Sequence, residues 1–408
     1  MKIQTLIAGL AVAASSLTAL AQNIAVKGKT VYTMAGTPIE NGVVVVRDGK
    51  IADVGREGRV RIPRGFDVLE AEVVTPGFID AHNVAGLAGI YNGGGQTHDQ
   101  DQLENSAPIQ PQLRAIDAYN AREPLVEYIR SFGITIVHTG HGPGQLISGQ
   151  TMIVKTVGDT VMDAMMVEEI AVAATLDPGV FGAAPGAPGT RGKAVAMLRA
   201  ELIKAQEYLA KIEAADDDSP PARDLKMESL GKVLTKDMPL LVTVHRAQDI
   251  ASAMRLAEEF GFTLWLDMAT EAYLLIHEIK AAGVPVFVHP TMYRASGEAE
   301  NLAFDTAAKL KEAGIEVVLQ GGFEGYVPKV RVVLFEAAWA AANGLGFEGA
   351  METITTAPAK LLGIDNRVGS IEEGKDGDLV LFNGDPFEYT TNVMTVIVEG
   401  EVVSEKRR

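Results

Sequence analysis

Five short apolar runs, spaced among helical patterns and loops, constrain the fold of this 408-residue chain more than any other feature. Each run is six to eight residues long and rich in aliphatic side chains, which is typical of strands buried in a parallel sheet. The runs are Gly133–Gly140, Leu240–His245, Phe262–Asp267, Val284–His289 and Ile315–Gln320. Amphipathic helices are predicted at Lys193–Ile212, Ala247–Phe260, Glu271–Ala282 and Leu302–Ala313. This alternation favours an α/β fold with a (β/α)₈ TIM barrel, and the alternative is an open doubly wound sheet.

Both ends of the chain, outside the first 21 residues, have the pattern of small β-structure. Gly42–Gly55 places two β-branched runs around Asp48-Gly49, a pair that favours a type I′ hairpin, and Thr395–Val403 repeats the plan around Glu399-Gly400. Isolated hairpins are marginally stable, so joining both ends into one sheet would stabilise each. The predicted organisation is a barrel over residues 73–366 and a composite β-domain from residues 22–72 and 367–408.

The first 21 residues have the features of a signal peptide. Lys2 precedes an apolar run, Leu6–Ala14, and Ala19-Leu20-Ala21 has the small-x-small pattern of a cleavage site. The apolar run is too short to cross a bilayer. We therefore expect cleavage after Ala21 and a periplasmic or secreted mature protein, with a retained membrane anchor as the alternative.

Composition excludes several classes of function. The 53 acidic residues outnumber the 36 basic ones, for a formal charge of −17, and this argues against binding to nucleic acid or to an anionic membrane. Cysteine is absent, so disulfides, thiolate ligands and a cysteine nucleophile are all excluded. A metal ion would have to be held by His, Asp, Glu or a modified Lys.

Four of the seven histidines, His82, His138, His245 and His289, close strand-like runs. In a barrel the active site lies at the carboxyl ends of the strands, where these four would meet. One such histidine is usually structural, but four at equivalent ends favour a site for zinc or a similar divalent ion. The glycine-rich segment His138–Thr151 is interpreted as a hairpin-like excursion or as a loop that approaches a ligand.

Three segments resemble a known family. Val73–Val84, VVTPGFIDAHNV, resembles the first barrel strand of the amidohydrolase superfamily, metal-dependent hydrolases that include imidazolonepropionase, dihydroorotase and dipeptidases acting on proline. Gly369–Phe387 resembles the segment that returns such chains to their small β-domain, and Thr356–Ile364 is similar to the helix before it. The resemblance covers essentially the whole mature chain and implies the barrel fold, but a fold alone does not define an activity.

The resemblance implies a ligand set that this chain retains only in part. His82 and His245 match the first-strand and fifth-strand histidines, and Lys155 is a weak candidate for the bridging lysine. At three positions where the family places the other ligands, this chain has lost the expected side chain. They are Val84 for the second first-strand histidine, Met268 for the sixth-strand histidine and Gly322 for the eighth-strand aspartate.

Replacement groups are available nearby in the sequence. His289 and His138 are predicted as further metal ligands, and Asp267 and Glu324 as catalytic carboxylates. Strand alternation places Asp267 opposite to position 268, so Asp267 would need a local kink to replace that ligand. The predicted substrate-binding residues are His141, Gln145 and Glu271. Too few ligands match for a two-metal centre, so we expect at most one divalent ion, zinc, per chain.

Two functions remain open at this stage. The first is an exported hydrolase of the amidohydrolase type that cleaves a carbon–nitrogen bond, in a non-peptide or cyclic amide of small size, by metal-assisted attack of water. The second is a non-catalytic binding protein, or the partner subunit of a related chain, that has lost the metal centre. An unrelated solute-binding protein is disfavoured because both chain ends match the amidohydrolase small domain. No nucleic-acid partner and no membrane span are expected, and a homo-oligomer stays open.

Overall fold

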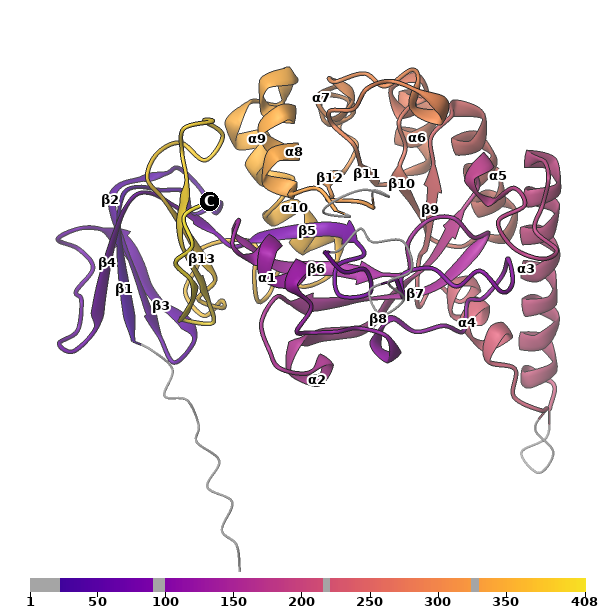
Figure 1. Cartoon of the computed structure of the whole chain (residues 1–408), viewed down its shortest axis with the longest axis horizontal. Coiled ribbons are helices and arrows are strands. Elements are labelled where there is room, and N and C mark those ends of the chain that lie inside the picture. Colours follow the sequence, from indigo (N-terminus) through magenta and orange to yellow (C-terminus); the bar gives the residue numbers. More distant parts are fainter. Residues whose placement is uncertain (1–22, 91–99, 216–220, 324–329) are drawn as a thin grey trace, which may run out of the picture.

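The computed structural model describes residues 23–90, 100–215, 221–323 and 330–408, which form two sheets with surrounding helices (Figure 1). The larger sheet has eight strands that follow the chain order. They are β5 (Phe78–Asn83), β6 (Ile134–Gly140), β7 (Ile147–Lys155), β8 (Met165–Thr175), β9 (Leu240–Val244), β10 (Leu264–Met268), β11 (Val286–Val288) and β12 (Val317–Leu319). A parallel bridge between Asn83 and Gly322 brings the first and last strand ends together. The predicted α/β barrel is confirmed, in a nearly closed form.

One strand runs against the others. β7 is antiparallel to both β6 and β8, whereas the remaining neighbours are parallel. The short loop 141–146 joins β6 to β7, so the segment His138–Thr151 is indeed a hairpin between barrel elements. Lys155 pairs with Ile136 near the start of β6 and therefore lies at the end of the barrel away from the strand carboxyl ends. The interpretation of Lys155 as the bridging lysine of the site is wrong.

Helices cover the outside of the barrel (Figure 1). They are α1 (Pro124–Arg130), α2 (Val161–Ala164), α3 (Arg191–Glu213), α4 (Leu225–Leu234), α5 (Ala247–Phe260), α6 (Ile276–Ala282), α7 (Thr306–Glu312), α8 (Val333–Ala340), α9 (Gly346–Glu352) and α10 (Thr356–Leu361). The predicted helix Glu271–Ala282 starts late, because a 3₁₀ turn at Ala272–Leu274 precedes α6. Gly261 caps α5 in the left-handed conformation, with φ of 75°.

The second sheet combines both chain ends, as the sequence predicted. Its order is β15-β14-β13-β4-β1-β2-β3, and β13 pairs antiparallel with β4, which joins the two halves. The strands are β1 (Ile24–Val31), β2 (Ile39–Arg47), β3 (Lys50–Arg56), β4 (Asp67–Pro76), β13 (Leu379–Phe382), β14 (Val393–Val398) and β15 (Glu401–Ser404). Both hairpin turns, Asp48-Gly49 and Glu399-Gly400, have positive φ at their two central residues, which type I′ turns require.

The barrel interior is filled by one layer of apolar side chains. Each strand contributes a buried residue, in the order Ile79, Ile136, Ile153, Ala171, Leu241, Trp265, Phe287 and Val318. No water-filled channel runs through such a layer, so a site has to lie at an end of the barrel.

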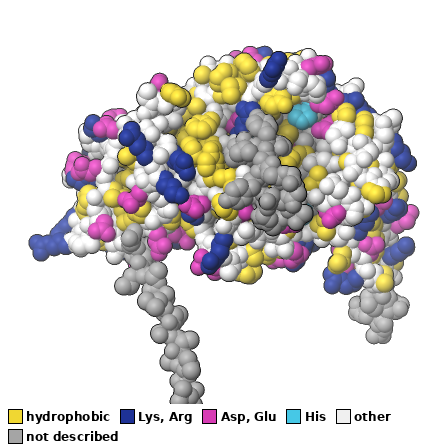
Figure 2. Space-filling model, viewed as in Figure 1, with side chains coloured by type: hydrophobic (Ala, Val, Ile, Leu, Met, Phe, Trp, Pro, Cys, Tyr) yellow, Lys and Arg dark blue, Asp and Glu magenta, His cyan; other side chains and the backbone are white. Residues whose placement is uncertain are grey.

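The described surface carries charges of both signs. On the face shown in Figure 2, acidic and basic side chains are interspersed among polar and apolar ones. None of the helices in the described ranges is long and apolar enough to cross a membrane.

Candidate functional site

A histidine and an aspartate meet across the mouth of the barrel. His82, at the end of β5, donates from Nδ1 to Oδ1 of Asp267 on β10 over 3.1 Å, and both side chains are buried. The same Oδ1 accepts from Nε2 of Gln320 at 2.7 Å, while Oδ2 accepts from the hydroxyl of Thr243 at 2.6 Å. These bonds link Asp267 on β10 to β5, to β9 and to the residue that follows β12. It faces inward with Trp265, two residues earlier, so the expectation that Asp267 needs a kink to reach the site is wrong.

This network defines the proton positions. Burial alone would raise the pKa of Asp267, but the adjacent His82 and the hydrogen bonds from His82, Thr243 and Gln320 outweigh it and lower that pKa. An ionised Asp267 selects the His82 tautomer with hydrogen on Nδ1. Nε2 of His82 then carries a lone pair, and this buried atom has no hydrogen-bond partner among the described residues. His82 is therefore an oriented base with its reactive nitrogen free.

His138 lies beneath His82, with 5.2 Å between the ring centroids, and both of its nitrogens are engaged. Nδ1 donates to the carbonyl of Ala81 at 2.6 Å, and Nε2 accepts from the Thr151 hydroxyl at 2.7 Å. Burial lowers the pKa of His138 to about 3, so the ring is neutral at ordinary pH. In this arrangement His138 offers no free lone pair to a metal ion.

The other two strand-end histidines are anchored in the same way as His82. His245 Nδ1 lies 2.7 Å from the Thr270 hydroxyl, and its Nε2 lies 3.8 Å from Asp177. Burial lowers the pKa of His245. His289 donates from Nδ1 to the carbonyl of Gln320 over 3.1 Å. Nδ1 is therefore the anchored nitrogen in both rings, as it is in His82.

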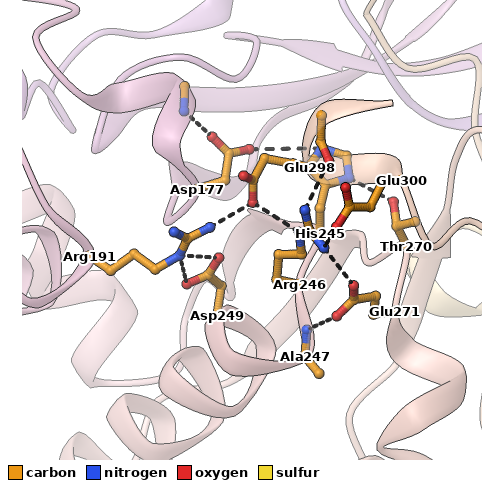
Figure 3. A network of polar contacts seen from close by, with 12 residues as sticks. Asp177, Arg191, His245, Arg246, Ala247, Asp249, Thr270, Glu271, Glu298 and Glu300 are labelled. Atoms are coloured by element: carbon orange, nitrogen blue, oxygen red, sulfur yellow. Dashed lines mark hydrogen bonds and ion pairs between the residues drawn. The ribbon is translucent and has the colours of Figure 1, made fainter. Parts of the chain in front are cut away.

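An ion-pair network surrounds His245 (Figure 3). Arg246 contacts Glu300 at 2.8 Å and Glu271 at 3.3 Å. The Glu271 carboxylate also accepts from the backbone nitrogen of Ala247 and from Asn301, each at 2.7 Å. Glu271, predicted to bind substrate, thus has its oxygens occupied in holding the start of α5 and the loop that contains Asn301.

The loop 141–146 lies over the strand carboxyl ends. Gly144 donates to the Thr175 hydroxyl at 3.2 Å, which ties the loop to the end of β8. Within the described ranges, both ring nitrogens of His141 and Oε1 of Gln145 are buried without a hydrogen-bond partner, and Nε2 of Gln145 donates to Asn105 at 2.8 Å. Burial lowers the pKa of His141 to about 4. These two predicted substrate-binding residues keep hydrogen-bonding capacity, whereas Glu324 lies outside the described residues.

Asp80 is a buried carboxyl next to the barrel mouth that sequence reasoning missed, although it stands two residues before His82 in the FIDAHN motif. Its carboxyl accepts from the backbone nitrogen of Gly321 at 2.7 Å and from Nδ2 of Asn83 at 2.8 Å. These bonds join the first barrel strand to the segment after the last one. Burial raises the pKa of Asp80 to about 7.

Replacing Asp80 with asparagine should reveal this raised pKa. Between about pH 4 and 7 the folded wild type binds the proton that the unfolded chain releases, so its stability falls as pH rises. The variant lacks this titration. Its stability relative to wild type should rise with pH by up to about 1.4 kcal/mol per unit and level off above pH 7. Urea unfolding from pH 4.5 to 8 measures the difference, and a pH-independent difference would contradict the assignment.

The described residues do not fit the metal centre that the sequence implied. Across the described stretches, no group of three or more His, Asp or Glu side chains is arranged to hold a metal ion. The Asp267 oxygens are occupied by hydrogen bonds, and His138 has no free nitrogen. A catalytic zinc site ordinarily has three protein ligands.

The architecture is thus a nearly closed α/β barrel with a polar mouth, joined to a composite β-sheet made from both chain ends. Residues 239–403 match the model of the Amidohydrolase family. An amidohydrolase from Thermotoga maritima MSB8 has 30% identity and a TM-score of 0.86, and the match covers 94% of this chain and 100% of that one. This chain belongs to the amidohydrolase superfamily.

Two further relatives are more distant. Amidohydrolase tasK of Hapsidospora irregularis is 25% identical over 398 residues, which cover 88% of this chain. The match spans 39% of that curated relative's length. Molinate hydrolase has 16% identity and a TM-score of 0.58, with 94% of this chain and 95% of that chain covered, and it shares the fold.

Proposed function

We propose that this protein hydrolyses the carbon–nitrogen bond of a small amide or cyclic amide, with His82 as general base. The observation that carries the proposal is the buried His82–Asp267 pair at the barrel mouth, in which Nε2 of His82 has no hydrogen-bond partner among the residues that the structure describes. General-base catalysis by histidine requires one ring nitrogen to be free, and an ionised carboxylate on the other nitrogen orients the ring. Membership of the amidohydrolase superfamily supports the reaction class.

The chain's own residues supply the proton transfers of such a reaction. Nε2 of His82 removes a proton from water as the water oxygen bonds to the carbonyl carbon. Asp267 stabilises the imidazolium that forms, and Thr243 and Gln320 keep Asp267 in place. His82 then returns the proton to the leaving nitrogen as the carbon–nitrogen bond breaks, which gives an acid and an amine. A positioned base of this kind contributes about 10²–10⁴-fold to a rate.

The substrate is small because the site is enclosed. His82, Asp267 and Gln320 are all buried, and the loop 141–146 lies over the strand ends. His141 and Gln145 contribute polar atoms that have no partner in the described part of the chain and that would bind the polar groups of an amide. We also propose that residues 1–21 are a signal peptide and that the mature protein is periplasmic or secreted; these residues lie outside the described part of the chain.

A second function is a binding protein or a partner subunit without catalysis. It is favoured by the absence, within the described stretches, of three metal-binding side chains in one group. Such a protein would bind an amide at the same mouth without cleaving it.

A substrate panel tests the proposed function. Protein purified without chelator is incubated with prolyl dipeptides, N-acyl amino acids, hydantoin and dihydrouracil, and products are identified by mass spectrometry. We expect one of these amide classes to yield acid and amine. His82→Asn should remove this activity, whereas His277→Asn, on an exposed face of α6, should retain it.

Elemental analysis of the same preparation should find at most one divalent ion per chain. Two tightly bound ions would contradict our account of the site. Thermal stabilisation by an amide that is never cleaved would support the binding protein.

A further inference from the structure

The outward face of α8 is apolar, although this helix lies on the outside of the barrel. A surface helix ordinarily presents polar side chains to solvent, and a helix that is apolar on all sides is ordinarily buried. Phe335 and Trp339 are four residues apart on α8 and share one face, and Phe335 is 57% exposed. The one charged residue of α8, Glu336, is buried and accepts from the backbone nitrogen and the hydroxyl of Thr291 at 2.6 Å. The exposed face of α8 is therefore of the kind that another protein surface covers.

A groove of about 850 Å³ lies between α8, the region of α1 and the segment that joins β13 to β14. On the face shown in Figure 2, apolar side chains gather at this junction of barrel and composite sheet. Aromatic residues, methionine and arginine are enriched at the cores of protein–protein interfaces, whereas lysine and aspartate are depleted. The described lining of the groove has this composition, since it contains neither lysine nor aspartate. We call it the aromatic groove, after Tyr128, Phe132, Phe335, Trp339, Phe387 and Tyr389 in its lining.

A tyrosine projects into the solvent at the rim of the aromatic groove. Tyr389 is fully exposed, in the segment that joins β13 to β14. Asp385 holds this segment, because its carboxylate accepts from the backbone nitrogen of Phe387 at 2.9 Å and its carbonyl accepts from that of Glu388 at 3.0 Å. The Phe387 ring also packs against Phe347 of α9, with 5.1 Å between the centroids. Tyr389 is therefore an exposed aromatic side chain on a well-anchored segment, directly beside an aromatic groove.

Two opposite charges at the aromatic groove have no ion-pair partner in the described part of the chain. They are the exposed side chains of Glu388 and Arg408. The Arg408 guanidinium lies over the rings of Tyr128 and Phe132, 5.5 Å from each centroid, and its Nε donates to the Ser131 hydroxyl at 2.9 Å. One surface thus carries a projecting ring, a groove and an unpaired charge of each sign. Such a surface can be self-complementary, which a two-fold contact between identical chains requires.

We propose that the aromatic groove is the interface of a homodimer with two-fold symmetry. Tyr389 of each copy inserts into the aromatic groove of the other copy, and Glu388 of each copy faces Arg408 of the other. A small molecule could fill the groove but would leave Tyr389 and the apolar face of α8 in water, whereas a second copy covers all three. Aromatic side chains seated in a pocket dominate the binding energy of many interfaces. This inference does not depend on the proposed hydrolysis.

Sedimentation velocity of the purified protein over about 0.5–50 µM tests the interface. Wild type should be dimeric at the upper end of this range. Tyr389→Ala should weaken dimerisation by about 100-fold or more, because each dimer loses two seated rings. Leu274→Ala is the matched control: Leu274 is 55% exposed and lies outside the groove, so its dissociation constant should stay within about threefold of wild type. A monomeric wild type at the highest concentration, or a dimer that Tyr389→Ala does not weaken, would overturn the proposal.

A charge exchange tests the two-fold arrangement. Glu388→Arg and Arg408→Glu should each weaken dimerisation by about threefold to tenfold, because like charges then meet across the axis. The double variant restores opposite charges at both contacts, so its dissociation constant should return to within about threefold of wild type. Both side chains are exposed, and the melting temperature of the monomer at low concentration should not change. A double variant that dimerises no better than the single variants would overturn the arrangement.

Discussion

Asp267→Asn should lower kcat for a hydrolysed amide by about 100-fold or more, with the fold intact. Asparagine can keep Oδ1 as the acceptor for His82 and Gln320, while its Nδ2 donates to the Thr243 hydroxyl, which can reverse its own bond. Each hydrogen bond of the Asp267 carboxylate therefore has a counterpart in the variant. What is lost is the negative charge that stabilises the His82 imidazolium during reaction.

Kinetics and urea unfolding of the same preparations separate the two effects. Thr243→Val is the matched control, because it removes one hydrogen bond to Asp267 and leaves the charge in place. We expect it to retain kcat within about tenfold of wild type. Full activity in Asp267→Asn would mean that His82 does not act as a base through this carboxylate. A collapse of stability in the same variant would instead assign Asp267 a purely structural role.

Local patterns predicted the barrel because they are properties of short segments. Runs such as Leu240–His245 became strands, and Gly261 ended a helix, since a buried parallel strand and a left-handed cap leave direct traces in neighbouring residues. The hairpin at His138–Thr151 was similarly visible in its glycines. The sequence did not show that this hairpin makes β7 antiparallel and carries Lys155 to the other end of the barrel, because strand direction depends on which strands pair.

The site was predicted only as a set of residues and not as a set of contacts. Strand ends identified His82 and His289, but the orientation of each ring is decided by partners far along the chain, such as Asp267, 185 residues from His82. The side chains of β10 alternate between the two faces of the strand as expected, but the sequence did not show which face points into the barrel. Glu271 has a carboxylate near the mouth, and only the structure shows that a backbone nitrogen and two side chains already occupy it.

A buried lysine joins the barrel to the composite sheet, and its removal should cause the largest loss of stability. Lys155, at the end of β7, contacts Asp376 at 2.7 Å and both Asp378 and Glu399 at 3.0 Å. Asp376 also pairs with Lys50 and Arg367, whereas the ammonium of Lys155 is the cation that contacts Asp378 within the described residues. Burial already raises the pKa of Asp378, and Lys155 opposes this effect.

Lys155→Met should therefore lower the free energy of unfolding at pH 8 by about 3–5 kcal/mol, because a buried carboxylate loses its counter-charge. The folded pKa of Asp378 should rise further above its unfolded value. An acid with a raised folded pKa destabilises the fold above that pKa, so the loss should shrink as pH falls toward about 4.

Lys406→Met is the matched control: Lys406 and its partner Glu127 are both about half exposed, and such pairs contribute less than about 1 kcal/mol. Urea unfolding of both variants from pH 4.5 to 8 measures these differences. A loss in Lys155→Met no larger than in Lys406→Met, or one that does not change with pH, would show that the joint between barrel and sheet is held by its apolar contacts alone.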